Sequence, residues 1–359
     1  MTRVLVVDDS ATCRHLLVTV LASDPALVVV GEARTGVEAL ELTLRLTPDI
    51  IVMDVHMPEM DGLEATRRIM ARRPTPILIV TSSASRDAAE RSLAAMHAGA
   101  LMVIAKPDDP ASPRFEDDRR QLLELTRALA DVKVVRRRGA LAGPVPAHAT
   151  ASASAAPVPT RSEPPPRPAR AGIVAVAAST GGPTALRRLL GALPADLPVP
   201  VAVVQHMARG FIRPLESFIA AASALPVTIA ENGRRLAPGV VHLAPEDRHL
   251  RVSAGGRVVL DDGPPIDGFR PSATALFESV AEVYGAAATA VVLTGMGRDG
   301  VQGLRAVRDG GGMVLAQDRE SSVVYGMAGE AVRSGVVDAV LPIDAIVATL
   351  VDRFGRLNG

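Results

Sequence analysis

The sequence predicts an α/β protein made of two doubly wound units joined by a linker. In both halves, short apolar runs rich in β-branched residues alternate with helical stretches, which is typical of buried parallel strands and the helices that cover them. Between the halves, residues 139–170 consist mainly of alanine, proline and serine with almost no large apolar side chain. The chain has 359 residues, enough for two domains that each bury a core. We therefore predict domains over 1–131 and 171–359, with an Ala/Pro-rich linker over 132–170.

Composition limits the class of protein. Basic and acidic residues number 39 each, and a chain without net charge lacks the basic face that nucleic acids require, so we expect no nucleic-acid partner. The single cysteine excludes a disulfide within the chain and favours a reducing compartment. There is no signal-peptide pattern, and no apolar run reaches the roughly 18 to 20 residues that span a bilayer. We expect a cytoplasmic protein with no membrane insertion.

The first unit is predicted to contain five parallel strands. Their apolar runs occupy residues 4–7, 27–30, 50–53, 77–80 and 101–104. Ser10 and Thr35 are typical N-cap residues for two of the connecting helices, and a last helix is predicted over 115–131. The basic run 133–138 is interpreted as a solvated helix end. Because functional groups of a doubly wound sheet gather at the carboxyl ends of its strands, the site is expected there.

Polar residues follow these strand ends. Asp8, Asp9 and Asp54 would bring three carboxylates to one rim, where they repel one another unless a divalent cation lies among them. Hard oxygen ligands in this number suit Mg²⁺. Thr81 and Lys106 follow the next two strands, and a hydroxyl and an ammonium group suit a phosphoryl group. Solvated acidic strand ends are the simpler alternative, but five matched positions favour a site.

The second unit repeats the alternation of strands and helices. Its strands are predicted over 172–178, 199–206, 288–295, 312–318 and 337–342. Its helices are predicted over 183–193, 210–222, 270–284, 299–309 and 343–354. The intervening residues 227–262 contain turn-forming Gly and Pro residues between stretches of alternating polar and apolar residues. This pattern predicts hairpins inserted into the α/β unit.

The first strand of this unit leads into the sequence ASTGGP, which places Ser179 on a glycine-rich turn before a helix with Pro183 in its first turn. Such a helix N-terminus can bind a phosphate. A serine on a sharp turn at a strand end can also be a nucleophile, and a plain turn is the third alternative. No lysine follows the glycines and the G-x-G-x-x-G spacing is absent, so the turn is neither a P-loop nor a dinucleotide site.

A serine nucleophile needs a base and a group that orients the base. His206 ends the next predicted strand, which would place it on the same rim as Ser179. Asp299 follows a glycine-rich turn after a later strand. His242 and His249 lie in the predicted hairpin region, and the sequence gives no reason to place them near the serine. Together these positions favour a Ser-His-Asp triad in an order that differs from chymotrypsin, subtilisin and the α/β hydrolases.

The first unit resembles the receiver domain of two-component response regulators. The motifs are VVDDS, DVHMPEMDG and AKP, and the resemblance covers roughly the first 125 residues. It implies a flavodoxin-like (βα)5 fold in which Asp54 accepts a phosphoryl group from a chemotaxis histidine kinase. It further implies that Asp8, Asp9 and Asp54 hold Mg²⁺, while Thr81 and Lys106 contact the phosphoryl oxygens.

The second unit resembles the catalytic domain of the chemotaxis methylesterases, which also deamidate glutamines. The motifs are ASTGGP, QHM, LTGMGRDG, RPSATALF and AQDRESSVVYGM, over about residues 171–353. The resemblance implies that Ser179 is the nucleophile, His206 the general base and Asp299 its orienting carboxylate. The implied substrate is the cytoplasmic part of a methyl-accepting chemoreceptor, and no cofactor is implied for ester hydrolysis.

The resemblance also places two further groups and shows some departures. Thr180 would lie at the site, and the backbone of Met296 would donate to the oxyanion. Val103 stands where receivers usually have an aromatic residue, so a rotating ring is not available to the switch. Other departures lie outside the triad, at Ala208, Thr274 and Ala328.

Two other functions are compatible with parts of the sequence. One is a phosphorylation-dependent binding module with an idle C-terminal domain, against which the intact triad argues. The other is a hydrolase of small esters, against which the receiver argues, because it ties the output to signalling.

Overall fold

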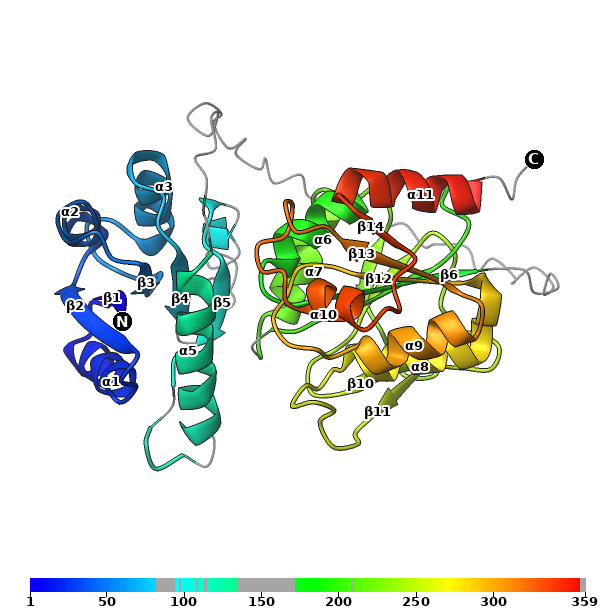
Figure 1. The fold of residues 1–359 in the computed structure, drawn as a ribbon, viewed down its shortest axis with the longest axis horizontal. Helices are drawn as coiled ribbons and strands as arrows, with labels where there is room; N and C mark the ends of the chain where they lie inside the picture. The colour runs from blue at the N-terminus through cyan, green and yellow to red at the C-terminus, as the bar shows by residue number, and fades with distance from the viewer. Residues whose placement is uncertain are drawn as a thin grey trace, which may run out of the picture.

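The computed structural model describes most of both predicted units. The described residues are 1–81, 94–96, 98–107, 109–112, 115–132, 134, 172–207 and 209–355. They form two parallel sheets, one in each half of the chain (Figure 1). The proline-rich stretch 139–170 and Ala208 lie outside the described residues. Within the described part, no helix combines the length and the apolar character needed to cross a membrane.

The first sheet has the strand order β2-β1-β3-β4-β5, with parallel neighbours throughout. This is the order of flavodoxin-like folds, as expected. Ser10 and Thr35 are N-caps, accepting hydrogen bonds from the amides of Cys13 and Glu38. The elements are β1 (Thr2–Val7), α1 (Ala11–Ala22), β2 (Leu27–Ala33), α2 (Gly36–Leu46), β3 (Ile50–Met53), α3 (Gly62–Arg72), β4 (Ile77–Thr81), β5 (Met102–Ala105) and α5 (Phe115–Ala130).

The second sheet has seven strands in the order β14-β13-β12-β6-β7-β9-β8, again all parallel. Its first elements are β6 (Ile173–Ala178), α6 (Gly182–Gly191), β7 (Val201–Gln205), α7 (Ile212–Ala220), β8 (Val227–Ile229), β9 (Val241–Leu243), β10 (His249–Ser253) and β11 (Arg257–Asp261). The remainder are α8 (Ala273–Tyr284), the 3-10 turn η1 (Gly285–Ala287), β12 (Ala288–Val292), α9 (Val301–Asp309), β13 (Met313–Gln317), α10 (Met327–Arg333), β14 (Ala339–Leu341) and α11 (Ile343–Gly355).

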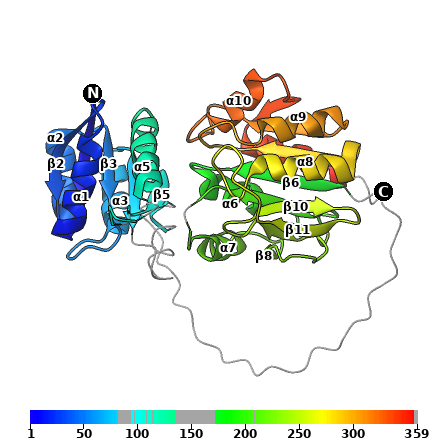
Figure 2. The same cartoon turned by 90° about the horizontal axis from the view of Figure 1, so that it is seen from below.

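Helices cover both faces of this sheet, as a doubly wound fold requires (Figures 1 and 2). Helices α6, α7 and α11 pack on one face through residues such as Leu186, Leu215 and Leu350. Helices α8, α9 and α10 pack on the other through residues such as Phe277 and Leu304. The strands are apolar on both sides because both sides are buried.

The predicted hairpins over 227–262 are only partly present. Strands β10 and β11 form the inserted antiparallel hairpin, with His249 opposite Asp261. Strands β9 and β8, in contrast, extend the main sheet in parallel: β9 pairs with β7, and β8 pairs with β9 at the edge. Alternation identifies a strand but not its partner, and the connection 230–240 contains no helix that would indicate a parallel crossover.

Candidate functional site

The predicted triad residues meet at the carboxyl edge of the seven-stranded sheet. Strand β6 pairs with β7 on one side and β12 on the other. Ser179 follows β6, and its amide donates to the carbonyl of Thr294 after β12 (3.0 Å). His206 follows β7, and its amide donates to the carbonyl of Ala178 (3.0 Å). The parallel register therefore brings the serine and the histidine to one edge, where the loop after β12 also places Asp299.

His206 and Asp299 form a buried pair. Their side chains are joined by a 2.9 Å contact between Nε2 and Oδ2, and the residues are 5% and 1% exposed. Burial raises the pKa of Asp299, but hydrogen bonds from His206, Ser272 and Ala273 outweigh it and lower the pKa to about 2. An ionised carboxylate only accepts, so the proton lies on Nε2 and Nδ1 is the accepting nitrogen. Nδ1 is buried without a hydrogen-bond partner among the described residues.

Asp299 is held by the N-terminus of α8. Ser272, the N-cap, donates from Oγ to Oδ1 (2.7 Å), while the amides of Ala273 and Thr274 donate to Oδ2 (2.6 Å) and Oδ1 (3.1 Å). A helix N-terminus stabilises a negative charge through its free amides and its dipole. Thr274, one of the departures from the family pattern, also accepts the Gly300 amide through Oγ1 (2.9 Å). The carboxylate is therefore fixed before any substrate arrives.

Phe269 covers one face of the His206 ring. The two rings are stacked with centroids 3.9 Å apart and planes 10° from parallel. Phe269 comes from the segment between β11 and α8, far from β7 in the sequence. Phe269 was not among the predicted site residues; its one signal in the sequence is an aromatic residue within the glycine- and proline-rich stretch 263–271, in a chain with only 2% aromatic residues.

Gln205 connects the backbones of the serine and the histidine. Its buried Nε2 donates to the carbonyl oxygens of Ser179 and His206, both at 2.8 Å. A Cβ atom at Gly182 would lie 1.9 Å from Gln205 Oε1. The second glycine of the ASTGGP turn therefore makes room for the amide that ties these two residues together.

Thr180 and Met296 lie beside the triad. The Thr180 carbonyl accepts from Thr294 Oγ1 (2.9 Å), and its own buried hydroxyl has no partner within the described chain. Met296 lies in the loop after β12, where Gly297 has a φ of 89°. No hydrogen bond joins the Met296 amide to another described residue, which leaves that amide able to donate to a substrate.

The receiver residues form a second site at the carboxyl edge of the first sheet. Lys106 Nζ lies 2.7 Å from both Asp8 Oδ2 and Asp54 Oδ2. Burial lowers the pKa of Lys106, but the two carboxylates outweigh it and raise the pKa above its ordinary value. Burial raises the pKa of Asp8 despite the opposing effect of Lys106. The lysine therefore neutralises part of the charge of a buried acidic pair.

The oxygen donors of this second site fit a divalent cation. Asp8, Asp9 and Asp54 each offer a carboxylate oxygen, and these atoms lie within 4.8 Å of one another. Three hard oxygen ligands at this spacing suit Mg²⁺. Thr81 ends β4 with a buried hydroxyl that has no partner in the described part of the chain. All five predicted receiver residues are thus at one strand edge.

Comparisons with known proteins agree with this architecture. Residues 4–112 match the response regulator receiver domain and residues 174–350 match the CheB methylesterase family. Protein-glutamate methylesterase/protein-glutamine glutaminase 4 of Myxococcus xanthus is 51% identical over 99% of this chain and 98% of its own. Protein-glutamate methylesterase/protein-glutamine glutaminase 3 of Anaeromyxobacter dehalogenans is also 51% identical to this chain, over 98% of both chains. The Thermotoga maritima CheB catalytic domain superposes with a TM-score of 0.50 at 39% identity, covering 51% of this chain and 99% of that one.

The fold and these matches define a response regulator whose output domain is a hydrolase. The chain belongs to the CheB family of protein-glutamate methylesterase/protein-glutamine glutaminases. The resemblance drawn from the motifs and the two-unit α/β fold class are thereby confirmed.

Proposed function

We propose that this chain is a phosphorylation-regulated serine hydrolase that demethylates glutamate methyl esters, and deamidates glutamines, on chemoreceptors. The observation that supports this most strongly is the buried pair of His206 and Asp299 beside Ser179, with the imidazole oriented so that Nδ1 is free to accept. Because the proposed substrate is the cytoplasmic part of a receptor, the proposed place of action is the cytoplasm.

The reaction begins with attack by Ser179 Oγ on the side-chain carbonyl carbon of the methylated glutamate. His206 Nδ1 takes the hydroxyl proton, and Asp299 stabilises the imidazolium that forms. The carbonyl oxygen becomes negatively charged, and the Met296 amide donates to it. One such preorganised donor typically lowers the barrier by about 3 to 4 kcal/mol.

The intermediate then collapses to an acyl-enzyme. The C–O bond to the methoxy group breaks, and His206 gives its proton to the departing methanol. Water attacks the acyl carbon with His206 again as base, which releases the glutamate and restores the Ser179 hydroxyl. Glutamine follows the same path with ammonia as the leaving group, so one site serves both reactions.

The receiver is proposed to control this chemistry through Asp54. Its carboxylate would accept a phosphoryl group from a chemotaxis histidine kinase. Asp8, Asp9 and Asp54 would hold Mg²⁺, which when bound neutralises charge on the phosphoryl oxygens. Lys106, now paired with Asp8 and Asp54, and the Thr81 hydroxyl, which has no partner among the described residues, would contact those oxygens.

The test measures methanol release from a methylated receptor fragment. Ser179→Ala and His206→Ala should abolish release, whereas Ser253→Ala at the end of β10 should not change it. A fluorophosphonate probe should label the wild type at Ser179 and fail to label Ser179→Ala. A methylated receptor that binds without methanol release or labelling would identify a binding module, and release from small esters alone would identify a general esterase.

A further inference from the structure

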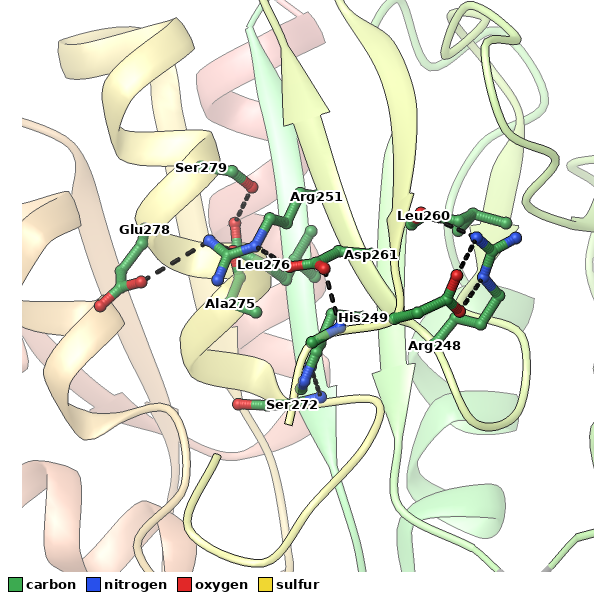
Figure 3. A network of polar contacts seen from close by, with 12 residues as sticks. Arg248, His249, Arg251, Leu260, Asp261, Ser272, Ala275, Leu276, Glu278 and Ser279 are labelled. Carbon is green, nitrogen blue, oxygen red and sulfur yellow. Dashed lines mark hydrogen bonds and ion pairs between the residues drawn. The ribbon is translucent and has the colours of Figure 1, made fainter. Parts of the chain in front are cut away.

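His249 lies against the N-cap of α8 (Figure 3). It is the first residue of β10 and is 1% exposed. Its Nδ1 atom is 3.2 Å from the backbone nitrogen of Ser272, and its Nε2 atom is 3.0 Å from the carbonyl oxygen of Pro264. An amide only donates and a carbonyl only accepts, so the ring is neutral with its proton on Nε2.

Ser272 connects this histidine to the triad. Three donors to the Asp299 carboxylate belong to consecutive residues, namely the Ser272 hydroxyl and the amides of Ala273 and Thr274. Among the described residues, the remaining partner of the carboxylate is His206. A shift of the Ser272 backbone would therefore displace every donor that holds Asp299 apart from the catalytic imidazole itself.

The hairpin that carries His249 is fixed on α8 by further contacts (Figure 3). Arg251 lies 3.3 Å from Asp261 on the paired strand and 3.7 Å from Glu278 on α8. The Val252 amide donates to Ser279 Oγ (3.0 Å). These contacts keep β10 in place along α8, so the hairpin holds His249 against the N-terminus of this helix.

We propose that His249 is a positioning residue for the hydrolytic reaction. By accepting the Ser272 amide, its neutral ring fixes the N-terminus of α8, and through it Asp299 and the plane of His206. His249 does not touch the substrate. The inference rests on the proposed triad and gives the inserted hairpin a part in the chemistry.

His242, in β9 of the main sheet, is a control for His249. It is also buried, and its Nε2 also accepts a backbone amide, that of Ala237 (3.1 Å). Within the described part of the chain, Ala237 forms no hydrogen bond with the residues that hold Asp299. Removing either ring deprives one backbone amide of its acceptor, but only the amide bonded to His249, that of Ser272, belongs to a residue that holds Asp299.

The experiment measures kcat and KM for ester hydrolysis by the full chain. His249→Leu should lower kcat by about 10- to 100-fold, the effect of a small misplacement of reacting groups. KM should stay within about twofold, because no group that binds substrate is removed. His249→Asn, which retains an acceptor near the position of Nδ1, should recover most of the loss. His242→Leu should lower the melting temperature without lowering kcat per folded molecule.

A double-mutant cycle with Asp299→Ala decides whether His249 acts through the carboxylate. In that background, His249→Leu should reduce kcat by less than about twofold, because the group it positions is gone. If the kcat losses of His249→Leu and Asp299→Ala multiply in the double variant, the role of His249 is overturned while the triad stands. The same holds if His249→Leu and His242→Leu have equal kcat. A fully active Asp299→Ala would overturn the triad and the inference with it. If the leucine variant does not fold, His249→Phe takes its place in the cycle.

Discussion

The role of each nitrogen of His206 is decided by its surroundings. Nε2 donates its hydrogen to the Asp299 carboxylate, Phe269 covers a ring face, and Nδ1 is left as the accepting atom. The imidazole therefore cannot exchange its two nitrogens without breaking a buried hydrogen bond to a charged group. Such charge-assisted hydrogen bonds are stronger than neutral ones, which makes this tautomer a stable property of the site.

The ionised state of Asp299 makes stability depend on pH. Its pKa falls from 3.8 to about 2 on folding, so its contribution is present above pH 3.8 and is lost as pH falls through 2. The shift corresponds to about 2 kcal/mol. Urea unfolding should show Asp299→Asn to be less stable than wild type at pH 7, with the difference shrinking between pH 4 and 2. Asp309→Asn, at an exposed position, should differ little throughout, and a pH-independent deficit of Asp299→Asn would contradict the assignment.

Substitutions of the three triad residues should not reduce activity equally. In the proposed mechanism Ser179 and His206 exchange bonds and protons, whereas Asp299 only orients the base, so Asp299→Asn should retain more activity than Ser179→Ala or His206→Ala. The double variant Ser179→Ala/His206→Ala should be no slower than either single variant, because the residues act as a unit. Methanol release measured over hours would resolve these residual rates, and a slower Asp299→Asn than Ser179→Ala would contradict the ranking.

The sequence located residues that lie at strand ends but not those that act across the fold. Ser179 and His206 could be placed because adjacent parallel strands end at one edge, and Asp299 because it follows a turn after a third strand. Phe269 could not be placed, and His249 was set aside, because their partners are distant in the chain. No local pattern reports that a hairpin folds back onto the N-terminus of a later helix.

At the scale of elements, the strands were predictable where burial on both faces makes them continuously apolar. This is so for β1 and β3 in the first sheet and for β6 in the second. The pairing of β8 with β9 could not be predicted, because each strand is only three residues long and the segment between them lacks a helix. Helix α10 was also not predicted, since its seven residues are too few for a clear period.

The turn between β6 and α6 should tolerate no side chain at its second glycine. Gly182→Ala would place Cβ 1.9 Å from Gln205 Oε1 and push away the amide that joins the Ser179 and His206 backbones. We expect kcat per folded molecule to fall by about 10-fold or more, as for other small misplacements of reacting groups. Gly312→Ala, whose Cβ would also be crowded at 2.7 Å from Val307 but away from the site, should lower stability and leave kcat per folded molecule unchanged. Equal kinetic effects in both variants would show that Gln205 is not involved.

In the whole molecule, the receiver packs beside the catalytic edge of the second sheet. Met296, Val323 and Val324 pack against the apolar cluster that includes α5 and β5, the receiver elements nearest to the second domain in both views (Figures 1 and 2). Val323 also lies over the turn after Ser179, where a Cβ atom at Gly181 would be 2.5 Å from it. One valine thus joins the receiver's surface to the turn after Ser179. This contact supports a receiver that restricts access to the serine until it moves.

Phosphorylation should relieve this restriction. A phosphoryl group on Asp54 adds charge beside Lys106 and Thr81 and would break the present pairing of Lys106, which shifts the loops next to β5. Interfaces between domains of one chain are modest, so a change of a few kcal/mol is enough to open one. Val103 is buried in β5 and offers no ring to rotate, so we expect a smaller activation than in relatives with an aromatic residue there.

Three forms of the enzyme test this regulation, namely the full chain, the full chain with beryllofluoride as a phosphate mimic, and the fragment 171–359. Methanol release should be slowest for the untreated full chain and faster for both other forms, because each removes the receiver from the region of Ser179. Asp54→Ala, which lacks the acceptor, should not respond to beryllofluoride. Equal rates for the fragment and the untreated chain would show that the receiver does not inhibit. A response that survives Asp54→Ala would place the switch at another residue, because the mimic binds only where an acceptor carboxylate is present.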